Sequence, residues 1–151
     1  MQRWIIVGVV AVGLLMGGAV FGYYTIRQNR PCPIWVPIPT NPELPIAKRD
    51  EIIGDLKEKL SRIELLEKVS RDLSLSSKLK FANDRTVAAD LANRLFVRAG
   101  DMDTPNGKVP AIHIGFSGKV KHKTITEQTT MRLMDDAWPL LGIEPPKKPV
   151  P

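Results

Sequence analysis

The feature that most constrains this chain of 151 residues is an uncharged, apolar stretch from Trp4 to Tyr24. A helix rises 1.5 Å per residue, so a helix of this length covers the hydrocarbon core of a bilayer, which is about 30 Å thick. Trp4 at one end and Tyr23 with Tyr24 at the other match the preference of amphipathic rings for the headgroup level. The stretch predicts a membrane anchor, residues 1–30 with its flanks, in a single-pass membrane protein that contacts the lipid bilayer.

A cleaved signal peptide is the alternative explanation of the same stretch. Gly17 and Ala19 are small enough for positions −3 and −1 of a cleavage site, and cleavage would release a soluble, secreted domain. We favour a retained anchor because the apolar run continues to Tyr24 and because Arg3 is the only basic residue before it. Basic residues are almost equally frequent on the two sides, so the positive-inside rule gives only a slight preference for a cytoplasmic domain.

One face of the predicted membrane helix consists mostly of small residues. Gly8, Ala11, Leu15, Gly18 and Gly22 follow one another at intervals of three and four. Small residues let helix backbones approach closely in lipid. This face predicts self-association or docking to another membrane protein. The alternative is the general abundance of glycine in membrane helices.

Residues 31–47, PCPIWVPIPTNPELPIA, are rich in proline. Proline fixes φ near −65° and has no N–H to donate to a sheet. The segment therefore predicts an exposed, extended spacer. A short strand at Ile34, Trp35 and Val36 is the alternative, and the prolines would confine such a strand to the edge of a sheet.

From residue 48 onward the pattern becomes helical. Apolar residues at intervals of three and four form one stripe, which contains Ile52, Leu56, Leu60, Ile63, Leu66, Val69 and Leu73. Ser61 followed by Glu64 is a capping-box pair, so we expect two helices with a joint near Leu60. A continuous coiled coil is the alternative, but the repeat stops at LSLSSKLK.

The rest of the domain predicts a helix, a hairpin and a final helix. TVAADLANRLF from Thr86 has a helical pattern and can end as the strand RLFVR, while AIHIGFS alternates apolar and polar residues as a half-buried strand does. The last helix is expected over 126–138, before a Pro/Lys tail at 141–151. The predicted fold class is α+β: a small domain, 48–140, of two or three helices packed on a short antiparallel sheet.

A basic cluster follows the second predicted strand. The chain has a formal net charge of +6, and the sequence GKVKHKT places Lys119, Lys121, His122 and Lys123 close together. This cluster predicts an anion-binding loop for phosphate, anionic lipid or an acidic glycan. The alternative, which we prefer from sequence alone, is a solvated basic loop. No aromatic residues alternate with these lysines, so we expect no nucleic-acid partner.

The sequence contains no recognisable catalytic, cofactor or metal site. Asp101 and Asp103 begin a calcium-like loop, but Ile112 stands where a bidentate glutamate is needed. His113 and His122 have a spacing that fits no metal motif. No nucleophile elbow, phosphate-binding loop or zinc signature is present. We therefore expect a non-enzymatic protein that uses no cofactor and no metal.

The order of segments resembles the base domain of the polysaccharide chain-length determinant (polysaccharide co-polymerase) family over about residues 48–138. The resemblance rests on IHIGFSGK and on a serine-led helix that ends in Leu-x-Leu, formed by Ser61, Leu65, Val69, Leu73 and Leu75. The family's long coiled-coil hairpin and second membrane helix are absent from this sequence. The resemblance implies a bacterial inner-membrane protein with a periplasmic domain that assembles with itself or with larger relatives.

The sequence as a whole predicts an interaction or assembly domain. We expect a reduced, chain-length-determinant-like component of envelope polysaccharide export, and no residue pattern in the sequence supports contact with a glycan. In this view the helix with Ser61, Leu65, Val69 and Leu73 makes lateral contacts with neighbours. An accessory structural subunit of another large membrane complex is the alternative. The partners would then be unrelated subunits of that complex.

Overall fold

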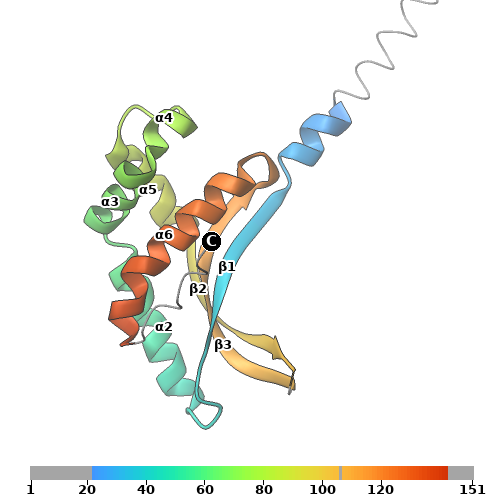
Figure 1. The fold of residues 1–151 in the computed structure, drawn as a ribbon, viewed down its shortest axis with the longest axis vertical. Helices are drawn as coiled ribbons and strands as arrows, with labels where there is room; N and C mark the ends of the chain where they lie inside the picture. The colour runs from blue at the N-terminus through green and yellow to red at the C-terminus, as the bar shows by residue number, and fades with distance from the viewer. Residues whose placement is uncertain (1–21, 106, 143–151) are drawn as a thin grey trace, which may run out of the picture.

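The computed structural model describes residues 22–105 and 107–142, which form an α+β domain. Three antiparallel strands make one sheet in the order β1–β3–β2, and the helices cover one of its faces (Figure 1). The elements are β1 (Pro31–Pro39), α2 (Ile46–Leu60), α3 (Ile63–Leu73), α4 (Leu75–Leu79), α5 (Asp84–Arg94), β2 (Leu95–Thr104), β3 (Gly107–Lys119), a 3-10 helix (Val120–His122) and α6 (Lys123–Leu141). The predicted fold class is confirmed at this level. The described residues contain more helices than the two or three expected.

The predicted single-pass membrane localisation is contradicted. Within residues 22–105 and 107–142, no helix is both long enough and apolar enough to cross a bilayer. Most of the predicted anchor lies outside the described residues, including four members of its small-residue face, Gly8, Ala11, Leu15 and Gly18. Gly22, the fifth member, belongs to a short helical stretch at 22–28, and nothing lies within 4 Å of the position a Cβ would take there.

The proline-rich segment is a strand over most of its length, which corrects the predicted spacer at 31–47. All nine residues of β1 pair with β3. The Thr40 N–H donates to the Pro110 carbonyl at 2.9 Å, so the even-numbered residues direct their backbone groups towards β3. Within β1, prolines occupy only odd positions, whose N–H groups would face the free edge. Their missing donors therefore cost no ladder bonds, and they also protect the edge from pairing with another chain. The domain thus begins before residue 48.

The predicted joint between the first two helices is confirmed, but the predicted cap is wrong. Helix α2 ends at Leu60 and α3 begins at Ile63. The Ser61 hydroxyl donates to the Glu58 carbonyl at 3.1 Å instead of capping α3, and Arg62 occupies the cap position without a side-chain bond. Ser61 therefore ends one helix and does not start the next.

The residues predicted to make lateral contacts belong largely to the interior. Val69 is fully buried, and Leu65 and Leu73 are half-buried against the hydrophobic core; Ser61 is half-buried at the joint. The apolar stripe of α3 packs against α5 and α6, which provide the apolar partners that it needs within the same chain. Most of the contact area of this helix face is thus used inside the domain.

The predicted hairpin is present and is longer than its sequence pattern indicated. Helix α5 continues directly into β2, which pairs with β3 from Leu95 opposite Phe116 to Thr104 opposite Gly107. Gly107 has a φ of 115°, a conformation that L residues with side chains rarely adopt, so glycine suits this end of the turn. The far end of the hairpin extends away from the helices (Figure 1).

Helix α6 is longer than the expected 126–138 and packs a polar stripe inward. Thr126, Thr129 and Thr130 are buried, and each hydroxyl donates to the carbonyl four residues earlier, at 3.0, 2.7 and 2.8 Å. These bonds satisfy the hydroxyls without a partner from another element. The small side chains bring α6 close to the sheet, and a Cβ at Gly118 would collide with Thr126. This contact fixes the start of α6 beside the end of β3.

Candidate functional site

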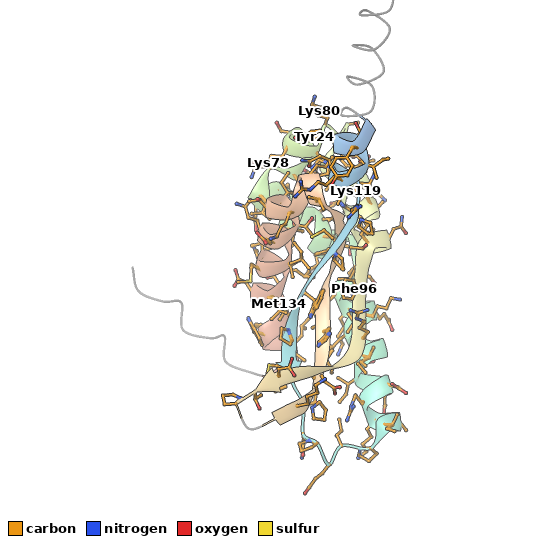
Figure 2. The ribbon with its side chains drawn as sticks, turned by 90° about the vertical axis from the view of Figure 1, so that its right-hand side faces the viewer. Tyr24, Lys78, Lys80, Phe96, Lys119 and Met134 are labelled. Carbon is orange, nitrogen blue, oxygen red and sulfur yellow. The ribbon has the colours of Figure 1, made fainter. Side chains whose placement is uncertain are left out.

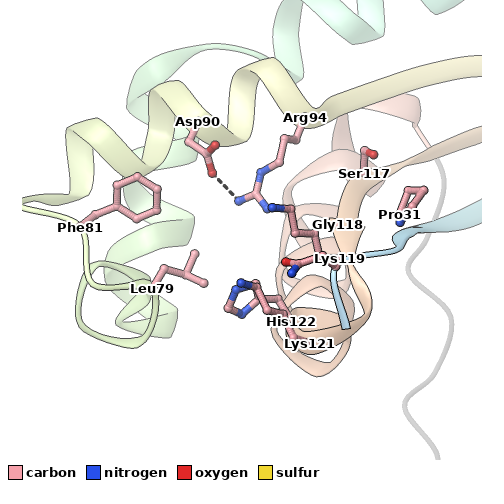
Figure 3. A pocket seen from close by; sticks show the side chains of 11 residues that line it. Pro31, Leu79, Phe81, Asp90, Arg94, Ser117, Gly118, Lys119, Lys121 and His122 are labelled. Carbon is pink, nitrogen blue, oxygen red and sulfur yellow. Dashed lines mark ion pairs between the residues drawn. The ribbon is translucent and has the colours of Figure 1, made fainter. Parts of the chain in front are cut away.

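A hollow with a distinct chemical character lies where β1 begins and β3 ends, opposite the segment that joins α4 to α5 (Figure 3). Its volume is about 460 Å³. We call it the basic pocket. It is lined by Asn29, Pro31, Leu79, Phe81, Asp90, Arg94, Ser117, Gly118, Lys119, Lys121 and His122.

The fold brings the basic side chains together from two directions. Lys119 is the last residue of β3, and the 3-10 helix after it presents Lys121 and His122. This short helix is held to the start of β1 because the Val120 N–H donates to the Arg30 carbonyl at 3.1 Å. Arg94 reaches the same space from the last turn of α5 (Figure 3).

Arg94 has hydrogen-bonding capacity that the described part of the chain does not use. One terminal nitrogen forms an ion pair with Asp90, one turn earlier in α5, at 2.5 Å. The Nε atom is buried and has no hydrogen-bond partner among the described residues. A buried donor without a partner carries a desolvation cost. The guanidinium is therefore held in place by one acid and still able to donate.

The charges of the basic pocket do not balance. Asp90 is the one acid among its lining residues, and it faces Arg94, Lys119 and Lys121. No ion pair of Lys119 or Lys121 occurs within the described ranges. Burial lowers the pKa of His122, and the charges of Lys121, Arg94 and Lys119 lower it further. The imidazole is therefore largely neutral near pH 7, and an anion nearby would favour its protonation.

The same end of the domain carries further lysines. Lys78 and Lys80, on and just after α4, lie towards the end that also holds Lys119 and Tyr24 (Figure 2). These side chains do not line the pocket, but they add positive potential around its opening. Basic side chains from several elements thus lie at this end.

One wall of the basic pocket is apolar. Leu79 ends α4 and Phe81 follows it; both are half-buried and pack on the edge of the core. The Phe81 N–H donates to the Ser76 carbonyl at 2.9 Å, and Lys80 between them has a φ of 60°. The left-handed residue turns the chain sharply, so that these two apolar side chains face the basic ones across the hollow (Figure 3).

Three of the four residues predicted to form an anion-binding loop lie together in the structure. Lys119, Lys121 and His122 line one pocket, whereas Lys123 does not. Lys123 is the first residue of α6 and forms an ion pair with Glu127 at 3.7 Å. Arg94 and Phe81 lie far from the loop in sequence and were not predicted as part of this site. The signal for Arg94 in the sequence was its position as a basic residue at the end of a predicted helix, next to a predicted strand.

The outer face of the sheet carries a second group of aromatic and basic side chains. Trp35 of β1 stacks on His113 of β3, with ring centroids 5.7 Å apart, and Arg98 of β2 lies over Trp35 and Phe96. His113 Nε2 also bonds to the Asp101 carbonyl at 3.1 Å. These groups satisfy one another, so His113 belongs to a packed surface and not to a reactive site.

The structure also shows where the residues considered as metal ligands in the sequence lie. Among the described residues, no group of three or more His, Cys, Asp and Glu side chains could hold a metal ion. Asp101 and Asp103 lie on β2 in the hairpin, where Asp103 pairs opposite Lys108 in the strand register.

Comparison with protein-family models, curated proteins and solved structures gave no match. The resemblance to the chain-length determinant base domain therefore stays a prediction from the residues quoted above. What the domain binds has to be inferred from the geometry and charge of the basic pocket.

Proposed function

We propose that this chain is a non-enzymatic binding domain whose basic pocket takes an anionic ligand. The observation that carries the proposal is the imbalance of fixed charge: one acid, Asp90, faces three cations contributed by α5, β3 and the 3-10 helix. Lysine and arginine side chains that lack acidic partners within the chain attract an anion from solution.

The position of the cations favours binding of a discrete anion over loose counter-ions. Arg94 is held by Asp90 and is about one quarter exposed, so its fork points in a fixed direction. Lys119 and Lys121 are exposed and can close on the anion from the opposite side. A phosphate, sulfate or carboxylate group has the acceptor geometry that such donors recognise.

Two features support binding without catalysis. The lining side chains include one hydroxyl, that of Ser117, and one imidazole, that of His122. Activation of the hydroxyl as a nucleophile would need a hydrogen bond between them. No hydrogen bond between these two is present within the described ranges. The arrangement supplies positive charge and shape, which are requirements of a binding site.

Assembly into a larger complex, the other function predicted from the sequence, stays a prediction. The helix face assigned to it, from Leu65 to Leu73, is used inside the domain. The proposed role in polysaccharide export rests on the family resemblance alone. The basic pocket offers a site where an acidic group of a glycan or of another partner would fit.

Titration of the full chain with sulfate tests the proposal, with amide NMR shifts as the readout. We expect saturable shifts at Arg94 and at residues 117–123, with a dissociation constant on the order of 1 mM, as a few charge-assisted hydrogen bonds would give. Chloride at equal ionic strength is the salt control. The double variant Lys119→Gln/Lys121→Gln should weaken sulfate binding about tenfold.

The matched control removes the same charge from the other end of the domain. Lys48 and Lys57 are exposed on α2, and neither lines the basic pocket. Lys48→Gln/Lys57→Gln should leave the sulfate affinity within about twofold of the parent value. Equal loss in both double variants, or shifts spread evenly over all lysines, would show general charge screening and contradict the proposal.

A further inference from the structure

We infer that the ligand of the basic pocket is an amphiphilic organic anion, with its charged group beside Arg94 and its apolar group against Leu79 and Phe81. The inference rests on the proposed function and adds the chemical class of the ligand. It follows from the fact that the hollow has two chemically different walls, which come from different parts of the chain.

The apolar wall is built before any ligand arrives. Phe81 is fixed by its backbone bond to Ser76, and the Lys80 N–H donates to the Ser77 carbonyl at 3.3 Å. Both Leu79 and Phe81 pack on core residues on one side and face the hollow on the other. A rigid apolar surface beside fixed cations lowers the entropic cost of binding a ligand that touches both.

The size of the hollow exceeds what an inorganic anion needs. A volume of about 460 Å³ lies within the range of roughly 300–1,000 Å³ that small-molecule sites occupy. Sulfate or phosphate bound beside Arg94 would fill a small part of it and leave Leu79 and Phe81 in water. An aromatic or aliphatic substituent on the anion would cover this wall, and burial of that apolar surface would add affinity.

The arrangement of charged and apolar residues around the hollow agrees with this orientation of the ligand. Lys119 and Lys121 lie on the side of β3 and the 3-10 helix, and Arg94 lies at the end of α5 (Figure 3). Leu79 and Phe81 lie on the side of α4. A ligand with charge at both ends would place one charge against the apolar wall without a partner, at a cost in desolvation. A ligand with charge at one end only meets both walls with matching chemistry.

Two phosphate monoesters that differ only in their substituent test the inference. Methyl phosphate and phenyl phosphate carry the same charge at about pH 8, where both are close to dianionic. We expect the full chain to bind phenyl phosphate about tenfold more tightly than methyl phosphate, measured by calorimetry or NMR titration. In addition, the phenyl ester alone should shift the Leu79 methyl resonances through its ring current, and this readout needs no variant.

A pair of phenylalanine variants shows where the ring binds. Phe81→Ala should remove most of the preference for phenyl phosphate and leave the affinity for methyl phosphate within about twofold. Phe96→Ala, which makes the same chemical change on the outer face of the sheet, should keep the preference. Because Phe81 also contacts the core, the amide spectrum of each variant shows whether it has kept its fold.

The outcomes separate the inference from the proposed function. Absence of binding for sulfate and for both esters would overturn the two together. Equal affinity for the two esters, with sulfate still bound at Arg94, would overturn only the inference. A preference that survives in Phe81→Ala but disappears in Phe96→Ala would place the ring elsewhere and overturn it as well.

Discussion

Arg94, the last residue of α5, and Arg132, in the middle of α6, differ in the number of acids that the chain supplies to each guanidinium. Arg132 of α6 donates from Nε and Nη2 to Asp72 of α3, at 2.9 and 2.7 Å, and from Nη1 to Asp136 at 2.9 Å. Lys68 also pairs with Asp136, at 3.1 Å. In this Arg132 cluster (Lys68, Asp72, Arg132 and Asp136) two acids balance two bases, whereas in the basic pocket one acid faces three.

The difference separates a structural charge cluster from a binding site. Burial alone would lower the pKa of Arg132, but its hydrogen bond with Asp72 and the negative charges of Asp136 and Asp72 raise that pKa above its usual value. The cluster joins α3 to α6 and needs nothing from outside. At Arg94 the chain provides one carboxylate and leaves Nε without a partner. Charge that a protein does not compensate itself is available to a ligand.

The largest effect that this comparison predicts is a loss of stability at the Arg132 cluster. Arg132→Gln removes three charge-assisted hydrogen bonds and leaves Asp72 without a base. We expect the free energy of unfolding to fall by about 1–2 kcal/mol, because the cluster is partly exposed and solvent screens the remaining charges. Urea denaturation of the full chain measures this change.

The same variant should leave sulfate binding unaltered, since the Arg132 cluster does not line the basic pocket. Arg85→Gln is the matched control: Arg85 is exposed on α5 and forms no ion pair within the described ranges. Its stability should change by less than about 0.5 kcal/mol. If Arg132→Gln weakened sulfate binding as strongly as it lowered stability, the two clusters would not have separate roles.

Local patterns predicted the parts of this fold that depend on neighbours in sequence. The helical stripe from Ile52 onward, the joint after Leu60 and the strand around Ile112 all follow from periodicity and turn chemistry. The basic loop at 119–122 was visible for the same reason. Each of these features depends on residues within one or two turns of helix or strand.

The parts that sequence analysis missed depend on pairings across the chain. Whether Pro31–Pro39 is a spacer or a strand is decided by β3, more than 70 positions away in the register, and proline composition alone favours a spacer. The basic pocket likewise needs Arg94 and Phe81 to meet a loop that begins at Lys119. Ser61 was misassigned because a capping box describes which bonds a sequence can form, whereas tertiary packing selects among them.

A smaller effect is expected when the acid of the basic pocket is neutralised. Asp90→Asn removes the ion pair with Arg94 and leaves three cations without an acid. The free energy of an exposed or half-exposed ion pair is at most about 1 kcal/mol, so we expect sulfate to bind about threefold more tightly. NMR titration at low ionic strength measures the gain, which added salt should reduce.

The matched control for this change is Asp55→Asn. Asp55 also pairs with a base four residues away, Lys59 at 3.4 Å, but on α2 at the other end of the domain. Its loss should not alter the affinity for sulfate. If Asp90→Asn weakened binding, Asp90 would be needed to orient Arg94, and charge balance would not be the property that distinguishes the pocket from the Arg132 cluster.

The smallest predicted effect is a pH dependence that only the basic pocket should show. The pKa of His122 is lowered from its ordinary value of 6.5, first by burial and then by Lys121, Arg94 and Lys119. Sulfate stays a dianion over this range and favours the protonated imidazole, so its affinity should rise about twofold as the pH falls from about 8 to about 5.5.

The stability of the free chain should change in the opposite direction. Because the folded pKa of His122 lies below the unfolded value, the unfolded chain binds more protons between the two values, and stability falls as the pH drops below 6.5. Saturating sulfate should reduce this loss. Thermal unfolding at several pH values, with and without sulfate, measures both effects. His122→Gln should reduce the effect of sulfate on the pH dependence of stability. His113→Gln, on the outer face, should not change that effect. A pH response that persists in His122→Gln would mean that a different group titrates. The pH dependence would then not be evidence that uncompensated charge in the basic pocket binds the anion.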